Sequence, residues 1–202
     1  MMSGRTIAQS ELILGGQKSG KSRRAEMLAR HWLEASSTHR AVLIATAQPW
    51  DEEMRQRIAR HQLDRALRVP GMTTVEEPLA LVEEIQKHSR AQTLVVVDCL
   101  TLWLTNRLMP VAASEAGPVY EKNRPTFTVE PVPEASLWTA ITQASGPVVL
   151  VGNEIGLGVI PMGVQVRAFV DALGRLNQDV AATCQRVTLM VSGLPLTLKD
   201  AQ

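Results

Sequence analysis

The chain has 202 residues, of which 45% are hydrophobic and 20% charged, and its formal net charge is +1. This balance is typical of one globular domain with a full core, and it argues against a basic protein that binds nucleic acid or a membrane surface. The first ten residues, MMSGRTIAQS, contain no long apolar stretch, so we expect no secretory signal and a cytoplasmic protein without membrane insertion. Cys99 and Cys184 lack metal-ligand spacing and are expected to be reduced thiols.

In chain order, apolar runs alternate with segments of helical period, which predicts an α/β fold with a mostly parallel central sheet flanked by helices. Several runs are continuously apolar, as in strands covered on both faces. The expected strands are Glu11–Leu14, Ala41–Thr46, Thr93–Asp98, Val148–Gly152 and Arg186–Val191, with weaker ones near Thr73–Val75 and Leu196–Lys199. The expected helices are Gly20–Ser36, Asp51–Leu63, Pro78–His88, Leu100–Leu108, Glu134–Ala144 and Gly163–Thr183.

The expected division of the chain is an N-terminal extension over residues 1–10 and a single α/β domain over residues 11–202. A Pro-rich excursion at 110–133 interrupts this domain and carries five of the eleven prolines. The excursion has no clear period and is long for a structureless loop within a compact domain. It is interpreted either as a surface loop or as a lid or subunit contact.

The first expected strand leads into a glycine-rich turn that matches a phosphate-binding P-loop. The stretch GGQKSGKS has Gly15, four residues, then Gly20, Lys21 and Ser22, and a helical segment follows it. Glycines let backbone N–H groups surround a phosphate, and the amino end of the helix favours negative charge at the same place. Lys21 is predicted to neutralise the outer phosphates and Ser22 to bind Mg²⁺. The alternative is a chance glycine turn before a helix.

The apolar run LVVVD ends in a carboxylate that suits the metal of a P-loop. Asp98 is expected at the carboxyl edge of the sheet, where open α/β sheets bind ligands. We therefore predict that Asp98 holds Mg²⁺ together with Ser22. The alternative role for Asp98 is to cap the helix expected from Leu100.

Two further segments place polar side chains at the same predicted edge. His61 lies near the expected carboxyl end of the helix that starts at Asp51, in line with Arg57. A histidine there needs no function because the helix dipole favours its cation, although histidine can also attack phosphorus. The stretch VVLVGNEIGLGVIP runs from a buried strand into Glu154, which can bind metal, water or a substrate hydroxyl, or simply belong to a glycine-rich turn.

The combined motifs resemble a known family. They are GGQKSGKSRRAE, IATAQPWDEEMRQRIARH, TTVEEP, VDCLTLWLTN, VGNEIGLGVIP and GRLNQ, in the order of the bifunctional adenosylcobinamide kinase / adenosylcobinamide-phosphate guanylyltransferase family of cobalamin biosynthesis. The resemblance implies a RecA-like P-loop NTPase fold and small homo-oligomers. It also implies two reactions: ATP or GTP phosphorylates adenosylcobinamide, and GMP passes from GTP to adenosylcobinamide phosphate through a GMP-histidine, giving adenosylcobinamide-GDP.

The resemblance assigns the role of nucleophile to His61, and Lys21 of the P-loop is the other predicted catalytic residue. Met72 replaces a tryptophan that the family often has, and Arg60 stands where some members have a second histidine. The implied nucleotide contacts are Gly15, Gly16, Gln17, Lys18, Ser19, Gly20, Lys21, Ser22, Ala45, Thr46, Ala47, Gln62, Leu63, Asp64, Arg65, Glu76 and Asp98.

Two other functions are compatible with the P-loop. A single-activity small-molecule kinase needs Lys21, Ser22 and Asp98 but not His61. A nucleotide-dependent binding module or switch needs tight nucleotide binding without a phosphorylated product. The absence of charge blocks and internal repeats gives the binding module little support.

Overall fold

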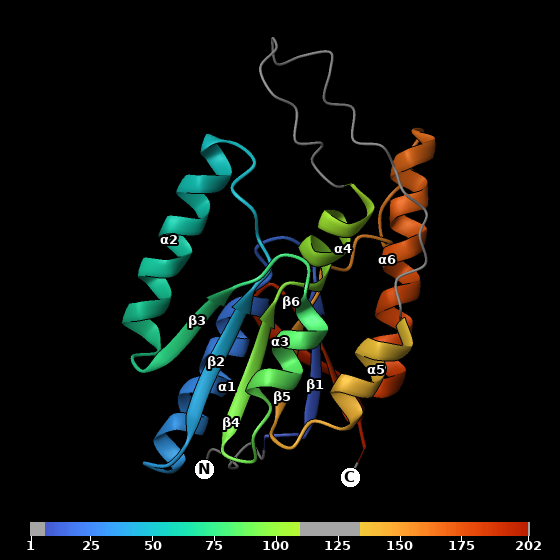
Figure 1. Cartoon of the computed structure of the whole chain (residues 1–202). Coiled ribbons are helices and arrows are strands. Elements are labelled where there is room, and N and C mark those ends of the chain that lie inside the picture. Colours follow the sequence, from blue (N-terminus) through green and yellow to red (C-terminus); the bar gives the residue numbers. More distant parts are fainter. Residues whose placement is uncertain (1–6, 110–133, 202) are drawn as a thin grey trace.

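A computed structural model describes residues 7–109 and 134–201, so the Pro-rich excursion at 110–133 lies outside the described residues. The described elements alternate between strands and helices along the chain, as the apolar pattern predicts (Figure 1). The strands are β1 (Ser10–Gly15), β2 (Arg40–Ala45), β3 (Met72–Glu76), β4 (Thr93–Asp98), β5 (Val148–Val151), β6 (Arg186–Val191) and β7 (Leu194–Asp200). The helices are α1 (Lys21–Ala35), α2 (Glu52–Arg68), α3 (Leu81–His88), α4 (Leu100–Leu108), α5 (Glu134–Thr142) and α6 (Val164–Thr183).

All the strands form one 7-stranded sheet in the order β3-β2-β4-β5-β1-β6-β7. Every pairing is parallel except that of β6 with β7, which confirms the mostly parallel sheet. The register aligns the carboxyl ends of neighbouring strands, because Ala45 pairs with both Glu76 and Asp98, and Asp98 pairs with Val151. One edge of the sheet therefore collects the residues that follow each buried strand.

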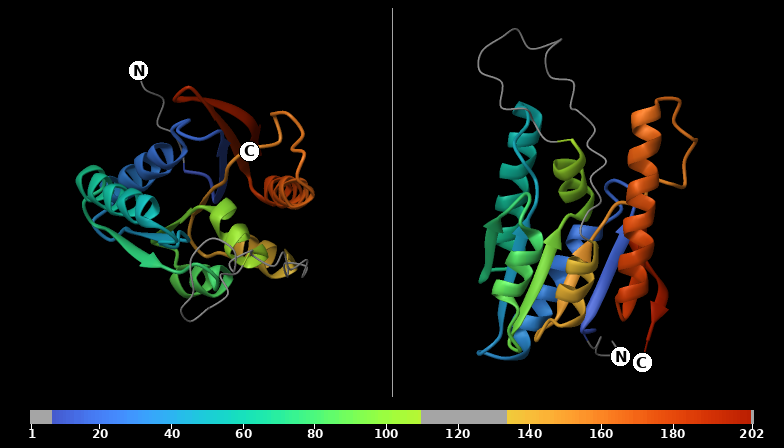
Figure 2. Two further views of the ribbon diagram at one scale, coloured as in Figure 1. Left: turned by 90° about the horizontal axis from the view of Figure 1, so that it is seen from above. Right: turned by 45° about the vertical axis from the view of Figure 1, so that its right-hand side comes forward.

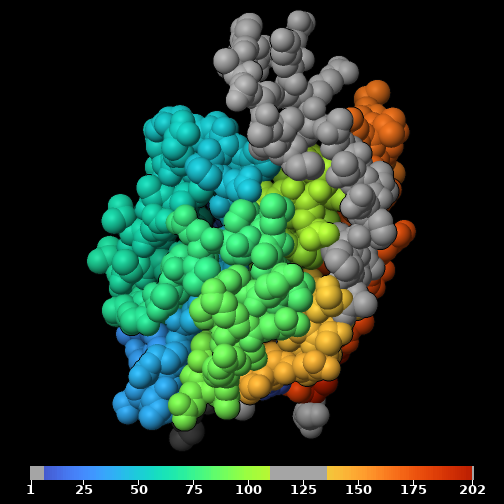
Figure 3. Space-filling view, viewed as in Figure 1, coloured from blue at the N-terminus to red at the C-terminus, as the bar shows by residue number. Residues whose placement is uncertain are grey.

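Helices cover both faces of the sheet and enclose two apolar cores. On one face α1 packs its buried side chains, such as Leu28, against strand residues that include Leu43 and Val96. On the other face α3, α4, α5 and α6 pack around Trp103 and the opposite side chains of the same strands. The view from above shows α1 separated from these helices by the sheet, and in the space-filling view α3 and α5 cover the sheet (Figures 2 and 3).

Helix α2 contributes little to either core and extends further than predicted. Arg65 is its only buried residue, and the rest of the helix stands beside the β2–β3 side of the sheet (Figure 1). It begins where predicted, since Asp51 caps it by accepting a hydrogen bond from the Met54 amide at 2.7 Å. It ends at Arg68 instead of Leu63, so His61 lies about two turns before the end and the prediction of a terminal histidine is wrong.

The amino-terminal boundary of the domain also differs slightly from the prediction. Ser10 belongs to β1, and Gln9 Nε2 donates hydrogen bonds to the carbonyls of Ala144 at 2.7 Å and Gly146 at 3.1 Å. These two residues, assigned to the extension by sequence, are therefore part of the domain. Over the described ranges, no helix combines the length and the apolar character needed to cross a membrane.

Candidate active site

The turn between β1 and α1 has the backbone shape of an anion-binding loop. Gly15 and Gly20 have φ values of 152° and 100°, which glycine adopts without strain. A Cβ atom on Gly15 would meet the Met190 carbonyl oxygen at 2.5 Å and Ser19 Oγ at 2.6 Å, so only glycine fits there. Helix α1 has no side-chain cap and no acidic residue in its first turn, which leaves its amino end available to a phosphate.

Lys21 lies folded against this loop. Its Nζ donates hydrogen bonds to the Gly16 carbonyl at 2.6 Å and to Ser19 Oγ at 3.5 Å, and the residue is buried. Burial lowers the pKa of the Lys21 ammonium, the nearby Cys99 and Asp98 oppose this shift, and the Arg57 guanidinium adds to it. A lysine that is partly desolvated and bound only to neutral acceptors gains from an added phosphate charge.

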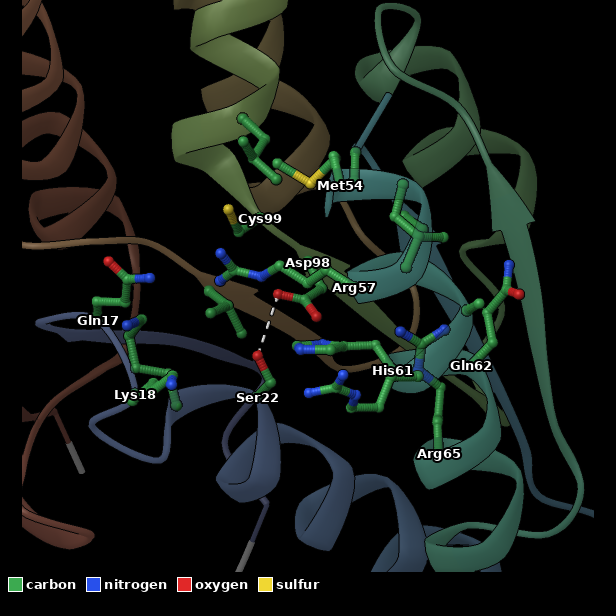
Figure 4. Close-up of a pocket in the computed structure, with 18 of the residues that line it drawn as sticks. Gln17, Lys18, Ser22, Met54, Arg57, His61, Gln62, Arg65, Asp98 and Cys99 are labelled. Atoms are coloured by element: carbon green, nitrogen blue, oxygen red, sulfur yellow. Dashed lines mark hydrogen bonds between the residues drawn. The ribbon is translucent and has the colours of Figure 1, made fainter. Parts of the chain in front are cut away.

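Ser22 and Asp98 meet at the end of the sheet. Ser22 Oγ donates a hydrogen bond to Asp98 Oδ1 at 3.3 Å, drawn as the dashed line in Figure 4. The N-cap of α4 is Cys99 and has no side-chain cap, so the alternative of Asp98 as the cap of α4 is not observed. A hydroxyl and a carboxylate beside a phosphate loop fit Mg²⁺, which prefers a few protein oxygens and completes its shell with phosphate and water.

The loop opens into a cavity of about 1020 Å³ between α1, α2 and the carboxyl ends of the strands. Cationic side chains, mostly from α2, dominate its polar lining, which suits a polyphosphate. The predicted site residues that line it are Gln17, Lys18, Ser19, Gly20, Lys21, Ser22, Ala45, Ala47, His61, Gln62, Arg65, Glu76 and Asp98.

His61 forms part of the cavity wall opposite the loop. In Figure 4, His61 and Arg57 extend from α2 toward the space beside Ser22 and Asp98. They are four positions apart and so share one helix face. The chemistry at this wall combines a nucleophile, the His61 imidazole, with a guanidinium that makes no hydrogen bond or ion pair with a described residue.

Two predicted contacts connect α2 to the sheet. Gln62 Nε2 donates a hydrogen bond to Glu76 Oε1 at 2.7 Å. Arg65 Nη1 donates to Thr74 Oγ1 at 3.2 Å, and its Nε lies 4.0 Å from Glu26 Oε1. These side chains line the cavity and also fix the angle at which α2 presents His61.

The remaining predicted contacts lie away from the cavity lining. Leu63 is 68% exposed, and Asp64 pairs with Arg68 one turn later on α2. Gly15 and Gly16 form the loop backbone without lining the cavity.

Thr46 is the clearest case of a predicted contact with a structural task. It is fully buried, and its Oγ1 donates to the Cys99 carbonyl at 2.7 Å and accepts from the Cys99 amide at 2.9 Å. Asn106 Nδ2 in turn donates to the Thr46 carbonyl at 2.7 Å. Thr46 therefore fixes the backbone directly after Asp98.

Some cavity residues lie within the quoted motifs but were not predicted as site residues. Arg57, Arg60 and Arg23 supply positive charge, and Asn153 and Ile155 close the side next to β5. The spacing of Arg57 one turn before His61 is the only sequence signal that points to any of the arginines. Glu154, a candidate ligand by sequence, accepts a hydrogen bond from the Gly156 amide at 2.8 Å.

The sheet order, the glycine loop and the lysine–serine–aspartate cluster define a P-loop α/β protein that binds nucleotides. Residues 11–198 match the model of the CobU family, described as cobinamide kinase / cobinamide phosphate guanyltransferase. The chain belongs to this family.

Curated relatives support the same assignment over nearly the full chain. The chain is 42% identical to the bifunctional adenosylcobalamin biosynthesis protein CobP of Pseudomonas aeruginosa, over 94% of this chain and 96% of the relative. It is 33% identical to the bifunctional adenosylcobalamin biosynthesis protein CobU of Escherichia coli, over 93% and 98% of the two chains. Among solved structures, the flagellar accessory protein FlaH of Methanocaldococcus jannaschii is 12% identical to this chain, with a TM-score of 0.51. The superposition covers 98% of this chain and 81% of that chain, and it shows the fold alone.

Proposed function

We propose that the chain phosphorylates adenosylcobinamide and then transfers GMP to adenosylcobinamide phosphate, using one cavity for both reactions. The observation that carries the proposal is that His61 and the P-loop line the same cavity from opposite sides. A triphosphate held by the loop can then be attacked at its γ-phosphorus by the acceptor hydroxyl and at its α-phosphorus by His61. Membership in a family described by both activities supports this reading.

For phosphoryl transfer, the loop amides and Lys21 bind and orient the outer phosphates of ATP or GTP. Ser22 Oγ and the Asp98 carboxylate would hold Mg²⁺, which neutralises phosphate charge when bound. The aminopropanol hydroxyl of adenosylcobinamide attacks the γ-phosphorus, the bond from the γ-phosphorus to the bridging oxygen breaks, and the nucleoside diphosphate leaves. Positive charge fixed by the fold before reaction stabilises the transition state without reorganisation.

For guanylyl transfer, a ring nitrogen of His61 attacks the α-phosphorus of GTP. A nitrogen–phosphorus bond forms as the bond to the β-phosphate breaks, and pyrophosphate leaves with the electron pair. A phosphate oxygen of adenosylcobinamide phosphate then attacks the same phosphorus and releases the neutral imidazole. Covalent catalysis divides one difficult displacement into two easier ones.

The proposal extends to the setting of the enzyme. We assign a cytoplasmic location, consistent with two buried free cysteines, Cys99 and Cys184. We also assign a homo-oligomer, which rests on the family resemblance. Of the nucleotide contacts outside the cavity lining, Gly15 and Gly16 are supported by the backbone of the P-loop, whereas Thr46, Leu63 and Asp64 remain part of the proposal only through that resemblance.

Covalent labelling tests the proposed function. Protein incubated with Mg²⁺ and GTP labelled at the α-phosphate is expected to retain the label after denaturation, whereas γ-labelled GTP leaves none. His61→Asn should abolish the label. His31→Asn, at an exposed histidine of α1 outside the cavity lining, is the matched control and should retain it. Absence of α-label on the unmodified protein contradicts guanylyl transfer and leaves the single-activity kinase.

A further inference from the structure

The segment between β5 and α6 exposes an unusual amount of apolar surface. Leu157 is 83% exposed, Val159 95%, Ile160 79% and Met162 96%. Single exposed apolar side chains are normal, but several in one short segment mark a surface that binds something.

Polar contacts hold this segment at both ends. The Glu154 amide donates to the Gly15 carbonyl at 3.1 Å, and Asn177 Nδ2 donates to the Asn153 carbonyl at 3.0 Å. At the other end, Arg167 Nη1 donates to the Pro161 carbonyl at 2.9 Å. The backbone on both sides of the apolar side chains is therefore held before any ligand arrives, which lowers the entropic cost of binding.

The segment also adjoins the phosphate loop. Asn153 and Ile155, at its start, line the cavity, and Glu154 is bonded to the first glycine of the loop. Figure 1 shows the segment passing from β5 to the start of α6, on the opposite side of the sheet edge from α2. The cavity thus has a charged wall on α2 and an apolar border on the other side.

A corrinoid acceptor requires such a border, and this step rests on the proposed function. The corrin macrocycle is large and has apolar faces, whereas a cavity of about 1020 Å³ with cationic walls also has to hold the nucleotide. The ring must therefore lie outside the cavity while its side-chain hydroxyl reaches the outer phosphate. We propose that the apolar segment formed by residues 155–164 is the binding platform for the corrin ring of cobinamide.

The test measures cobinamide binding directly, without catalysis. Equilibrium dialysis, read by the visible absorbance of cobinamide, compares the unmodified protein with the variant Leu157→Gln/Ile160→Gln/Met162→Gln. The dissociation constant is expected to rise by roughly tenfold or more, as when apolar contacts of a ligand are lost. The matched control changes three exposed leucines of β7 in the same way, Leu194→Gln/Leu196→Gln/Leu198→Gln, and should stay within about twofold.

Two further measurements separate this inference from its competitors. Labelling by α-labelled GTP needs no acceptor and should be equal in both triple variants, so a failure of guanylyl transfer is visible apart from the dialysis result. Sedimentation gives the oligomeric mass. The proposal is overturned if the dissociation constant is unchanged, or if the β7 variant loses as much affinity for cobinamide. It is also overturned if the loss of affinity accompanies dissociation into smaller species, and that result assigns the segment to a second copy of the chain.

Discussion

Replacing Thr46 by valine tests how the site is held together. The change keeps the shape of a fully buried side chain and removes its hydroxyl. That hydroxyl pairs with both the carbonyl and the amide of Cys99, at 2.7 and 2.9 Å. The Cys99 carbonyl keeps a second partner, because it also accepts from the Trp103 amide at 3.1 Å, so only the Cys99 amide is left unpaired. A buried polar group without a partner costs about 1–3 kcal/mol, and the free energy of unfolding should fall by about that amount.

Urea denaturation measures this change, with Thr46→Ser as the control because serine retains the hydroxyl. The valine variant should also bind GTP more weakly than the serine variant, because Asp98 directly precedes the backbone that Thr46 fixes. A loss below about 0.5 kcal/mol, the size of a neutral surface substitution, would refute the structural role assigned to Thr46. An intact fold with weakened GTP binding in the valine variant would instead favour Thr46 as a direct nucleotide contact.

Three further predictions concern charge and reactivity at the site. Lys21→Ala should lower the rate of phosphoryl transfer by about 10²–10⁴-fold in a steady-state assay, and a loss below about threefold would show that the loop has only a structural role. Arg57→Gln should slow pyrophosphate release from GTP by about 10–100-fold, since a charge-assisted hydrogen bond contributes about 1.5–3 kcal/mol, whereas Arg30→Gln on α1 should have no effect. Burial raises the pKa of the Cys99 and Cys184 thiols to about 12, so neither should react with iodoacetamide at pH 8 in the folded protein. Both should react in urea, and rapid alkylation of the native protein would contradict this burial.

Much of the sheet was predictable because its strands are buried on both faces. LVVVD and VVLV are continuous apolar runs and became β4 and β5. The edge strands β3 and β7 are largely exposed, so their sequences carry a weaker pattern and they were predicted too short. The end of α2 was missed because its last turn is held by ion pairs of Arg65 and Arg68 with Glu26 of α1, a contact that periodicity does not reveal.

The residues of the site likewise fall into two groups, those that a local sequence pattern indicates and those that only long-range contacts bring into place. The P-loop and Asp98 are local patterns of turn chemistry and strand ending, and the structure brings Ser22 and Asp98 together as predicted. The pairing of Thr46 with Cys99 joins residues 53 positions apart, and no sequence pattern indicates it. The spacing of Arg57 and His61 places both side chains on one face of α2, but that this face lines the cavity depends on how the helix packs.

The central claim is that GMP reaches its acceptor through His61, in the cavity that the P-loop also lines, and a single-turnover chase tests it most directly. Protein labelled with α-labelled GTP is freed of nucleotide and mixed with adenosylcobinamide phosphate. The account predicts that the label leaves the protein and appears in adenosylcobinamide-GDP, in an amount equal to the label lost. Label that stays on the protein, or that is released only as GMP, would contradict transfer through this histidine.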